Sequence, residues 1–175
     1  MTLADPEAVA PAPVPAWDAL GVRLVDIVTS PGHSYWGKAG EGRMMHGALH
    51  PAEATLVADM GIVGDRYFGE KPGGKAQVTF LQADVVAAVR EQFRLKKLPA
   101  SAFRRNLVVE GVNLGDYLGR EFTFQGITFE GTQECKPCQW MDRAVAPGVQ
   151  AFLREAFRGG LRAKVKSDGV LRVDA

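Results

Sequence analysis

Glycine is unusually frequent in this chain, and its frequency limits the folds that the chain can adopt. It accounts for 20 of 175 residues, about 11% where ~7% is usual. Glycine weakens helices and supplies the backbone freedom that tight turns need. The composition therefore favours short strands joined by turns and disfavours a helical bundle.

Apolar alternation predicts a series of short strands. The expected strands are residues 21–29, 52–58, 75–81, 106–109, 121–124 and 127–131. Gln125-Gly126 predicts a hairpin turn, and Asp168-Gly169 predicts a last hairpin between residues 161–165 and 170–173. Helical spacing predicts one helix over residues 82–98, with Lys96 and Lys97 near its end, and a second from Pro147 to Arg158.

These elements predict a mainly β (α+β) fold, a mostly antiparallel β-barrel with about two peripheral helices. The strands do not alternate with helices, which disfavours a doubly wound parallel sheet. Residues 1–18 hold four prolines and are expected to be an extended arm, pinned at its end by Trp17 and Leu20. Residues 19–175 are expected to form a single domain, and residues 30–47 a long Gly-rich loop.

Charge and composition exclude several classes of protein. The formal net charge is +1, which argues against nucleic-acid binding by bulk charge. The sequence has no run of 18 apolar residues, so it predicts no membrane span. The N-terminus lacks the features of a signal peptide. Two cysteines are too few for a disulfide scaffold and fit a reducing compartment. We expect a cytoplasmic protein.

The two cysteines, Cys135 and Cys138, form a C-x-x-C motif after a strand-like run. Pro137 favours an extended backbone before it, so the thiols are not expected on the first turn of a helix. Lys136 and Arg143 would favour the thiolate form. Two alternatives remain at this point. The cysteines could be structural thiols of the core, or they could bind zinc together with His46 and His50.

Basic residues near glycines recur at three distant places. They are Arg66 in the run Gly61–Arg66, with Lys71 and Lys75 after it; Arg104 and Arg105 before Asn106; and Arg162 after Gly159-Gly160. With the thiol pair, they predict an anion-binding pocket that has a cysteine at its base. If residues 104 and 105 are extended, their side chains point to opposite faces, and we expect Arg105 rather than Arg104 to enter the pocket.

The order of these motifs resembles the MOSC domain, the module named after the C-terminal part of molybdenum cofactor sulfurase. The matching runs are GIVGDR at 61–66, QVTF at 77–80, FRRN at 103–106, GREF at 119–122, GTQECKPC at 131–138 and RGGLRA at 158–163. The resemblance implies a β-barrel with a few peripheral helices. It also implies that one cysteine either binds the molybdenum cofactor or carries sulfur to a metal centre. The matching cysteine is Cys138, which we expect to be the metal ligand or the persulfide carrier, with Cys135 as an auxiliary thiol able to form a reversible disulfide.

The same resemblance implies that basic residues hold the pterin phosphate of the cofactor, and the candidates are Arg66, Arg104, Arg105 and Arg162. The expected cofactor-binding residues are Asp65, Arg66, Arg105, Asn106 and Arg162, with Asp65 and Asn106 included because they lie in loop-like charged segments. The chain lacks the aminotransferase-like domain of the full sulfurase, so no pyridoxal phosphate is expected. Three functions stay open: a cofactor-binding or persulfide-carrying module, a cofactor-dependent reductase of N-hydroxylated compounds, and a binding module with structural cysteines. The expected partners are the cofactor, a sulfur donor or acceptor protein, or an external electron donor, with no nucleic acid and no membrane.

Overall fold

The computed structural model describes residues 13–32 and 46–175. Most of the expected N-terminal arm and most of the expected Gly-rich loop lie outside the described residues. Nine strands are described: β1 (Arg23–Ile27), β2 (Glu53–Val57), β3 (Gly61–Ile62), β4 (Val78–Gln82), β5 (Leu107–Glu110), β6 (Glu121–Phe124), β7 (Ile127–Glu134), β8 (Leu161–Val165) and β9 (Gly169–Arg172).

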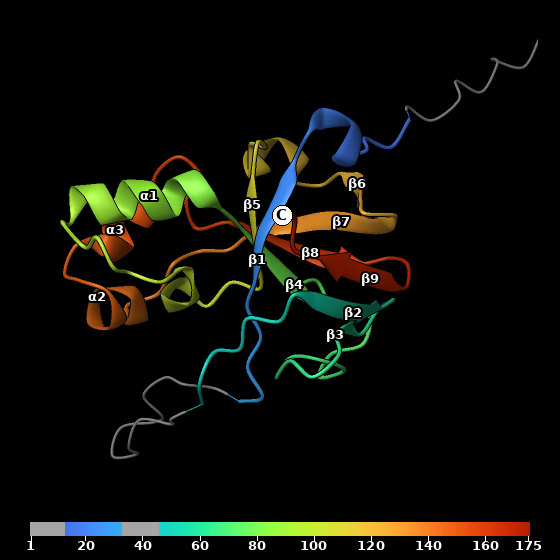
Figure 1. Ribbon diagram of the computed structural model, residues 1–175, viewed down its shortest axis with the longest axis horizontal. Coiled ribbons are helices and arrows are strands. Elements are labelled where there is room, and N and C mark those ends of the chain that lie inside the picture. The colour runs from blue at the N-terminus through green and yellow to red at the C-terminus, as the bar shows by residue number, and fades with distance from the viewer. Residues whose placement is uncertain (1–12, 33–45) are drawn as a thin grey trace, which may run out of the picture.

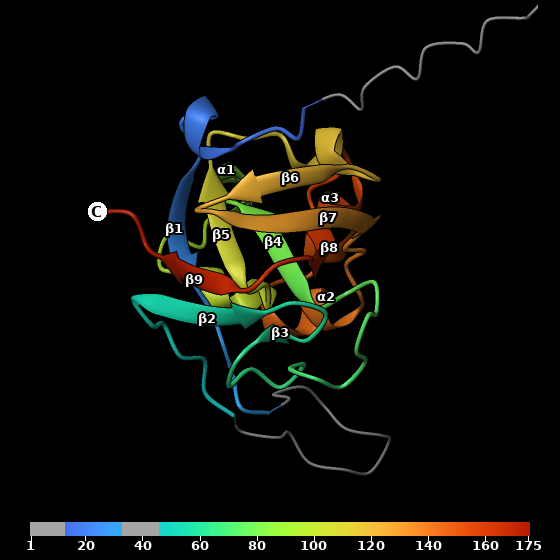
Figure 2. The ribbon, with the colours of Figure 1, turned by 90° about the vertical axis from the view of Figure 1, so that its right-hand side faces the viewer.

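The strands form two sheets. A six-stranded sheet has the order β1-β5-β4-β8-β7-β6 and curls into a half-barrel, and a three-stranded sheet has the order β3-β2-β9 (Figure 2). Every pair is antiparallel except β4 and β5, which are parallel. The mainly β, mostly antiparallel architecture expected from the sequence is confirmed.

Three α-helices are described: α1 (Ala83–Gln92), α2 (Trp140–Ala144) and α3 (Val149–Arg154). Three 3-10 turns accompany them, at Asp18–Leu20, Ala100–Phe103 and Leu114–Tyr117. The α-helices gather on one side of the six-stranded sheet, and the three-stranded sheet lies on the other side (Figure 1). None of the described helices is long and apolar enough to cross a membrane.

The expected helices were too long. Helix α1 ends at Gln92 because Arg94 has a left-handed backbone with a φ of 55°, which a right-handed helix cannot include. Lys96 and Lys97 therefore lie beyond the helix rather than in its last turn. The second expected helix begins later, at Val149, and ends before the positive φ of Ala156 and Phe157. Helix α2 was not expected.

The last hairpin was also predicted wrongly. Strand β8 pairs with β4 and β7, so both of its edges are occupied, and β9 pairs with β2 in the other sheet. The turn at Asp168-Gly169 leads from one sheet to the other instead of joining two neighbours. By contrast, the hairpin of β6 and β7 is confirmed, with positive φ at both Gln125 and Gly126.

Two apolar clusters hold the layers together. The larger lies between the two sheets and includes Leu24, Leu56 and Phe80. The smaller joins the helices to the six-stranded sheet and includes Leu81, Val89 and Leu153. Phe80 and Leu81 are consecutive residues of β4 and belong to different clusters, because successive side chains of a strand point to opposite faces. Strand β4 is therefore covered on both sides.

Trp17 anchors the described end of the N-terminal segment in the larger cluster. Its side chain is fully buried and stacks on Phe122 with the ring centroids 4.0 Å apart. Its amide donates to the carbonyl of Thr123, so the segment extends the sheet beyond β6. Leu20 was also expected to pin the end of the arm to the domain, but its side chain is 61% exposed and does not pack in the core.

Replacement of Trp17 tests this anchor. We expect Trp17→Ala to lower the free energy of unfolding by about 3–5 kcal/mol, because it leaves a large cavity. Leu20→Ala is the matched control and should change it by less than about 0.5 kcal/mol, as for an exposed site. Urea unfolding measures both values, and equal effects would contradict the anchor.

Candidate functional site

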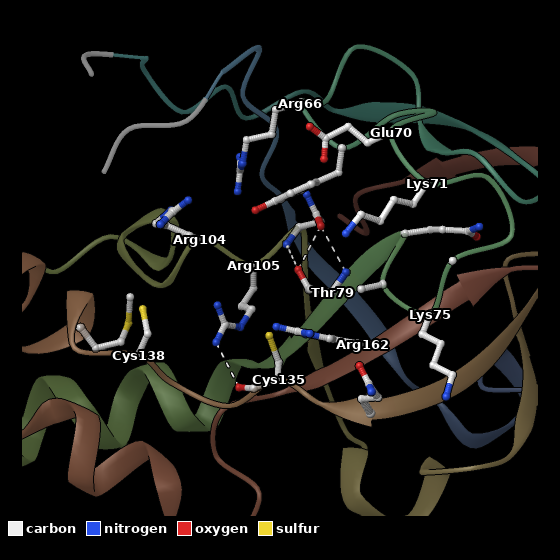
Figure 3. Close-up of a pocket in the computed structure, with 17 residues that line it drawn as sticks. Arg66, Glu70, Lys71, Lys75, Thr79, Arg104, Arg105, Cys135, Cys138 and Arg162 are labelled. Atoms are coloured by element: carbon white, nitrogen blue, oxygen red, sulfur yellow. Dashed lines mark hydrogen bonds between the residues drawn. The ribbon is translucent and has the colours of Figure 1, made fainter. Parts of the chain in front are cut away.

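A pocket of about 480 Å³ opens at one end of the six-stranded sheet, between the loop that follows β3 and helix α2 (Figure 3). It is lined by Arg66, Tyr67, Glu70, Lys71, Gly74, Lys75, Ala76, Gln77, Thr79, Arg104, Arg105, Asn106, Gln133, Cys135, Cys138, Met141 and Arg162. The thiol pair and the three basic clusters of the sequence thus meet in one cavity.

Strand register builds the floor of the pocket. Thr79 of β4 pairs with Arg162 of β8, which pairs with Gln133 of β7, so these three side chains lie in a row on one face. The pairing of Gln133 depends on an irregularity in β7 between Gly131 and Gln133, which leaves Thr132 as an extra residue. The Thr132 hydroxyl donates hydrogen bonds to the carbonyls of Lys75 and Arg162.

The C-x-x-C segment crosses one side of the pocket outside any helix or strand, as expected from Pro137. Cys135 follows the end of β7, is only 4% exposed and donates its amide to the carbonyl of Gly160, at 2.7 Å. Cys138 is exposed and lies just before α2, where its carbonyl accepts a hydrogen bond from the amide of Met141 at 3.0 Å. Both thiols are free.

Arg105 lines the pocket, but its guanidinium is bound to the backbone. Its Nε donates to the carbonyl of Gly159 at 2.9 Å, Nη1 to that of Phe103 at 2.9 Å, and Nη2 to that of Cys135 at 3.2 Å. Arg104 also lines the pocket. The expectation that Arg104 would face away was wrong, because its φ of 58° is left-handed rather than extended.

Arg66 and Arg162 line the pocket, and their side chains donate to no backbone carbonyl of the described residues. The Arg66 side chain is only 10% exposed, and its buried Nε has no hydrogen-bond partner among the described residues. Its Nη1 lies 3.7 Å from a carboxylate oxygen of Asp65. The Arg162 guanidinium has no hydrogen bond or ion pair within residues 13–32 and 46–175. Only the Nε of Arg66 is both buried and without a hydrogen-bond partner, because Arg162 is half-buried.

Asp65 and Asn106 were both expected in the pocket, but their side chains hydrogen-bond mainly to backbone groups. Asp65 does not line the cavity; its carboxylate accepts hydrogen bonds from the amides of Ser30 and Tyr67. Asn106 lines the cavity, but its amide group accepts from Thr79 and donates to the carbonyl of Val28. Asn106 thereby joins the ends of β1, β4 and β5.

The pocket concentrates positive charge in a chain whose formal net charge is only +1. Six of its described lining residues are arginine or lysine, against one carboxylate, Glu70. In Figure 3, Arg104 and Cys138 lie toward one end, and Lys71 and Lys75 toward the other. Cationic side chains therefore line both ends of the cavity.

The structure separates the histidines from the thiols. His50 pairs with Asp26 at 2.9 Å, and the imidazole of His46 lies against Gly32. Within the described residues, no group of three or more His, Cys, Asp and Glu side chains could hold a metal ion. Neither histidine lines the pocket that contains Cys135 and Cys138.

Sequence reasoning missed several lining residues: Tyr67, Glu70, Thr79, Gln133 and Met141. Two of them carried a usable signal. Met141 follows Cys138 by three positions, and Thr79 alternates with buried residues of its strand. Gln133 had no such signal, because its direction depends on the irregularity in β7.

Together, the fold and the pocket define a class: a small half-barrel module with a cysteine at the edge of a basic ligand cavity. The family model of the MOSC domain matches residues 46–175. The chain therefore belongs to the MOSC family, which is associated with the molybdenum cofactor. A search of curated proteins finds no significant match.

Solved structures share the fold. The YuaD protein from Bacillus subtilis is 14% identical with a TM-score of 0.63, and the match covers 87% of this chain and 91% of that one. YiiM from Geobacillus stearothermophilus is 16% identical with a TM-score of 0.63, covering 86% and 71%. YiiM from Escherichia coli is 18% identical with a TM-score of 0.60, covering 87% and 67%. In a further matched structure, a hypothetical protein, this chain covers 66% of the other chain.

The close approach of Gly159 to the C-x-x-C segment gives a test. A Cβ at Gly159 would overlap the carbonyl of Cys135, so we expect Gly159→Ala to lower the free energy of unfolding by about 1–3 kcal/mol. Gly47 has no atom near its Cβ position, and Gly47→Ala should be neutral or slightly stabilising. Urea unfolding compares them, and a neutral Gly159→Ala would contradict the packing.

Proposed function

We propose that this protein is a module that binds the molybdenum cofactor, with Cys138 as the thiolate ligand of the metal. One observation carries the proposal. The exposed thiol of Cys138 lines a cavity in which six of the described lining side chains are arginine or lysine and one is a carboxylate. A soft metal and an anion in one ligand would satisfy both the thiol and these cations.

The residues present fit the cofactor. The cavity volume of about 480 Å³ is within the ~300–1,000 Å³ typical of small-molecule sites. The pterin phosphate carries about two negative charges, like a phosphorylated side chain. A net charge of +1 gives a weak overall field, so local donors must attract this group. The six cationic lining residues supply them.

Different residues would serve different parts of the cofactor. Arg66 and Arg162 would hold the phosphate, because their side chains line the cavity and, unlike Arg105, bind no backbone carbonyl of the described residues. Lys71 and Lys75 would add charge at the rim. The backbone segments around the cavity would be held in place by Arg105, Asn106 and Asp65. When bound, the cofactor supplies a redox-active molybdenum centre, which Cys138 would orient.

A sulfur carrier is the second candidate, and the exposure of Cys138 favours it. A thiol that receives a sulfur atom from another protein must be reachable from solvent, and its thiolate must be the attacking group. The neighbouring cations would stabilise the anionic persulfide in the same way that they would stabilise the cofactor.

Cysteine substitutions test the ligand. We expect Cys138→Ser to lose most of the bound molybdenum and pterin, because the metal loses its thiolate, while Cys135→Ser keeps most of both. Metal analysis and pterin fluorescence of the purified variants give the readout. Equal losses from the two substitutions would contradict the assignment to Cys138.

The same preparations separate the candidate functions. Persulfide on Cys138 without metal would support the sulfur carrier. Metal and pterin, with turnover of an N-hydroxylated base by a chemical reductant, would identify a reductase. A protein that has neither metal nor persulfide after reconstitution would support a binding module in which the cysteines are structural.

The anion site has its own test. We expect Arg66→Ala to weaken binding of the cofactor by about 1.5–3 kcal/mol, roughly 10- to 150-fold in Kd, as for a charged hydrogen bond. Arg172→Ala is the control, because Arg172 is 66% exposed and paired with Glu53 outside the pocket. Titration of the apoprotein measures both, and unchanged affinity in Arg66→Ala would place the phosphate elsewhere.

A further inference from the structure

We propose that Arg105 is a positioning residue that keeps Cys135 and Cys138 apart, so that the C-x-x-C pair stays as two thiols instead of closing to a disulfide. The spacing alone predicts the opposite, because two cysteines three positions apart can form a bridge when their Cα atoms lie within about 7 Å. This inference concerns the chain's own thiols and does not depend on which ligand the pocket takes.

Arg105 joins three segments that are distant in the sequence. Its guanidinium donates to carbonyls of the turn before β5, the C-x-x-C segment and the turn before β8. The acceptors are Phe103, Cys135 and Gly159. Three such bonds from one planar group hold the group in one position.

The two cysteines are also tied to different parts of the fold. Cys135 is held to the sheet, by its amide on the carbonyl of Gly160 and by its carbonyl on Arg105. Cys138 is held to α2, through the bond from Met141. In the view of Figure 3, the guanidinium of Arg105 is drawn between the side chains of Cys138 and Cys135. Closing a disulfide would move the C-x-x-C segment, whose carbonyl at Cys135 accepts a hydrogen bond from Arg105.

The chemistry can be followed with oxidised glutathione. The thiolate of exposed Cys138 attacks one sulfur of the glutathione disulfide, which forms a mixed disulfide and releases one glutathione thiolate. In the second step, the thiolate of Cys135 would attack the Cys138 sulfur, closing the protein disulfide and releasing the second glutathione thiolate. We expect the wild-type protein to stop after the first step.

The experiment compares Arg105→Met with Arg104→Met in the apoprotein, using mass spectrometry to separate the mixed disulfide from the protein disulfide. The two variants remove the same charge from the same pocket. Loss of positive charge near a thiol lowers its thiolate fraction and should slow exchange. Loss of the brace should instead accelerate closure, so the sign of the effect separates the two causes.

We expect closure in Arg105→Met to be at least about tenfold faster than in the wild type. In Arg104→Met, the disulfide should not close faster than in the wild type. Arg105→Lys keeps the charge with fewer donors and should lie between wild type and Arg105→Met.

Two results would overturn the proposal: rapid closure in the wild-type protein, or closure in Arg105→Met no faster than in Arg104→Met. Circular dichroism shows whether each variant is folded. If Arg105→Met does not fold, the wild type and Arg105→Lys decide the question. The outcome is independent of the cofactor, because no metal or pterin is present in the assay.

Discussion

The site depends on a contact between backbones. The turn at Gly159-Gly160 lies against the carbonyls of Cys135 and Phe80 so closely that a Cβ on either glycine would overlap them. Gly160 also has a φ of 96°, which favours glycine. Only glycine allows the end of β7, the start of β8 and the middle of β4 to approach in this way. Arg105 then joins the carbonyls of Gly159 and Cys135, so the thiol segment becomes part of the sheet framework.

Around this contact, strand pairing decides which side chains face the ligand cavity. The row of Thr79, Arg162 and Gln133 comes from three strands, and its last member is brought into line by the extra residue in β7. The loop after β3 brings Arg66 and the rim lysines over this row. A chain with almost balanced charge thereby obtains a strongly basic cavity, because folding places its cations together and pairs cations such as Arg23 and Arg172 with carboxylates elsewhere.

Features set by neighbouring residues could be predicted from the sequence, while features set by distant contacts could not. The hairpin at Gln125-Gly126 was predicted correctly because its turn chemistry is local. The hairpin at Asp168-Gly169 was not, because β8 was already paired on both edges by strands far away in the sequence. The same distinction holds in the site. The thiols and the arginines were found from their residue types, but the direction of Arg104 depends on one left-handed φ, and the engagement of Arg105 depends on carbonyls 30 and 54 residues away.

We propose that Cys138 supplies a sulfur ligand to molybdenum held in this cavity. X-ray absorption spectroscopy at the molybdenum edge tests it most directly, on protein reconstituted with the cofactor. We expect the molybdenum that Cys138→Ser retains to have one sulfur fewer in its coordination sphere than in the wild-type protein, whereas Cys135→Ser leaves the sulfur count unchanged. An identical sulfur count in the wild-type protein and Cys138→Ser would contradict the proposal.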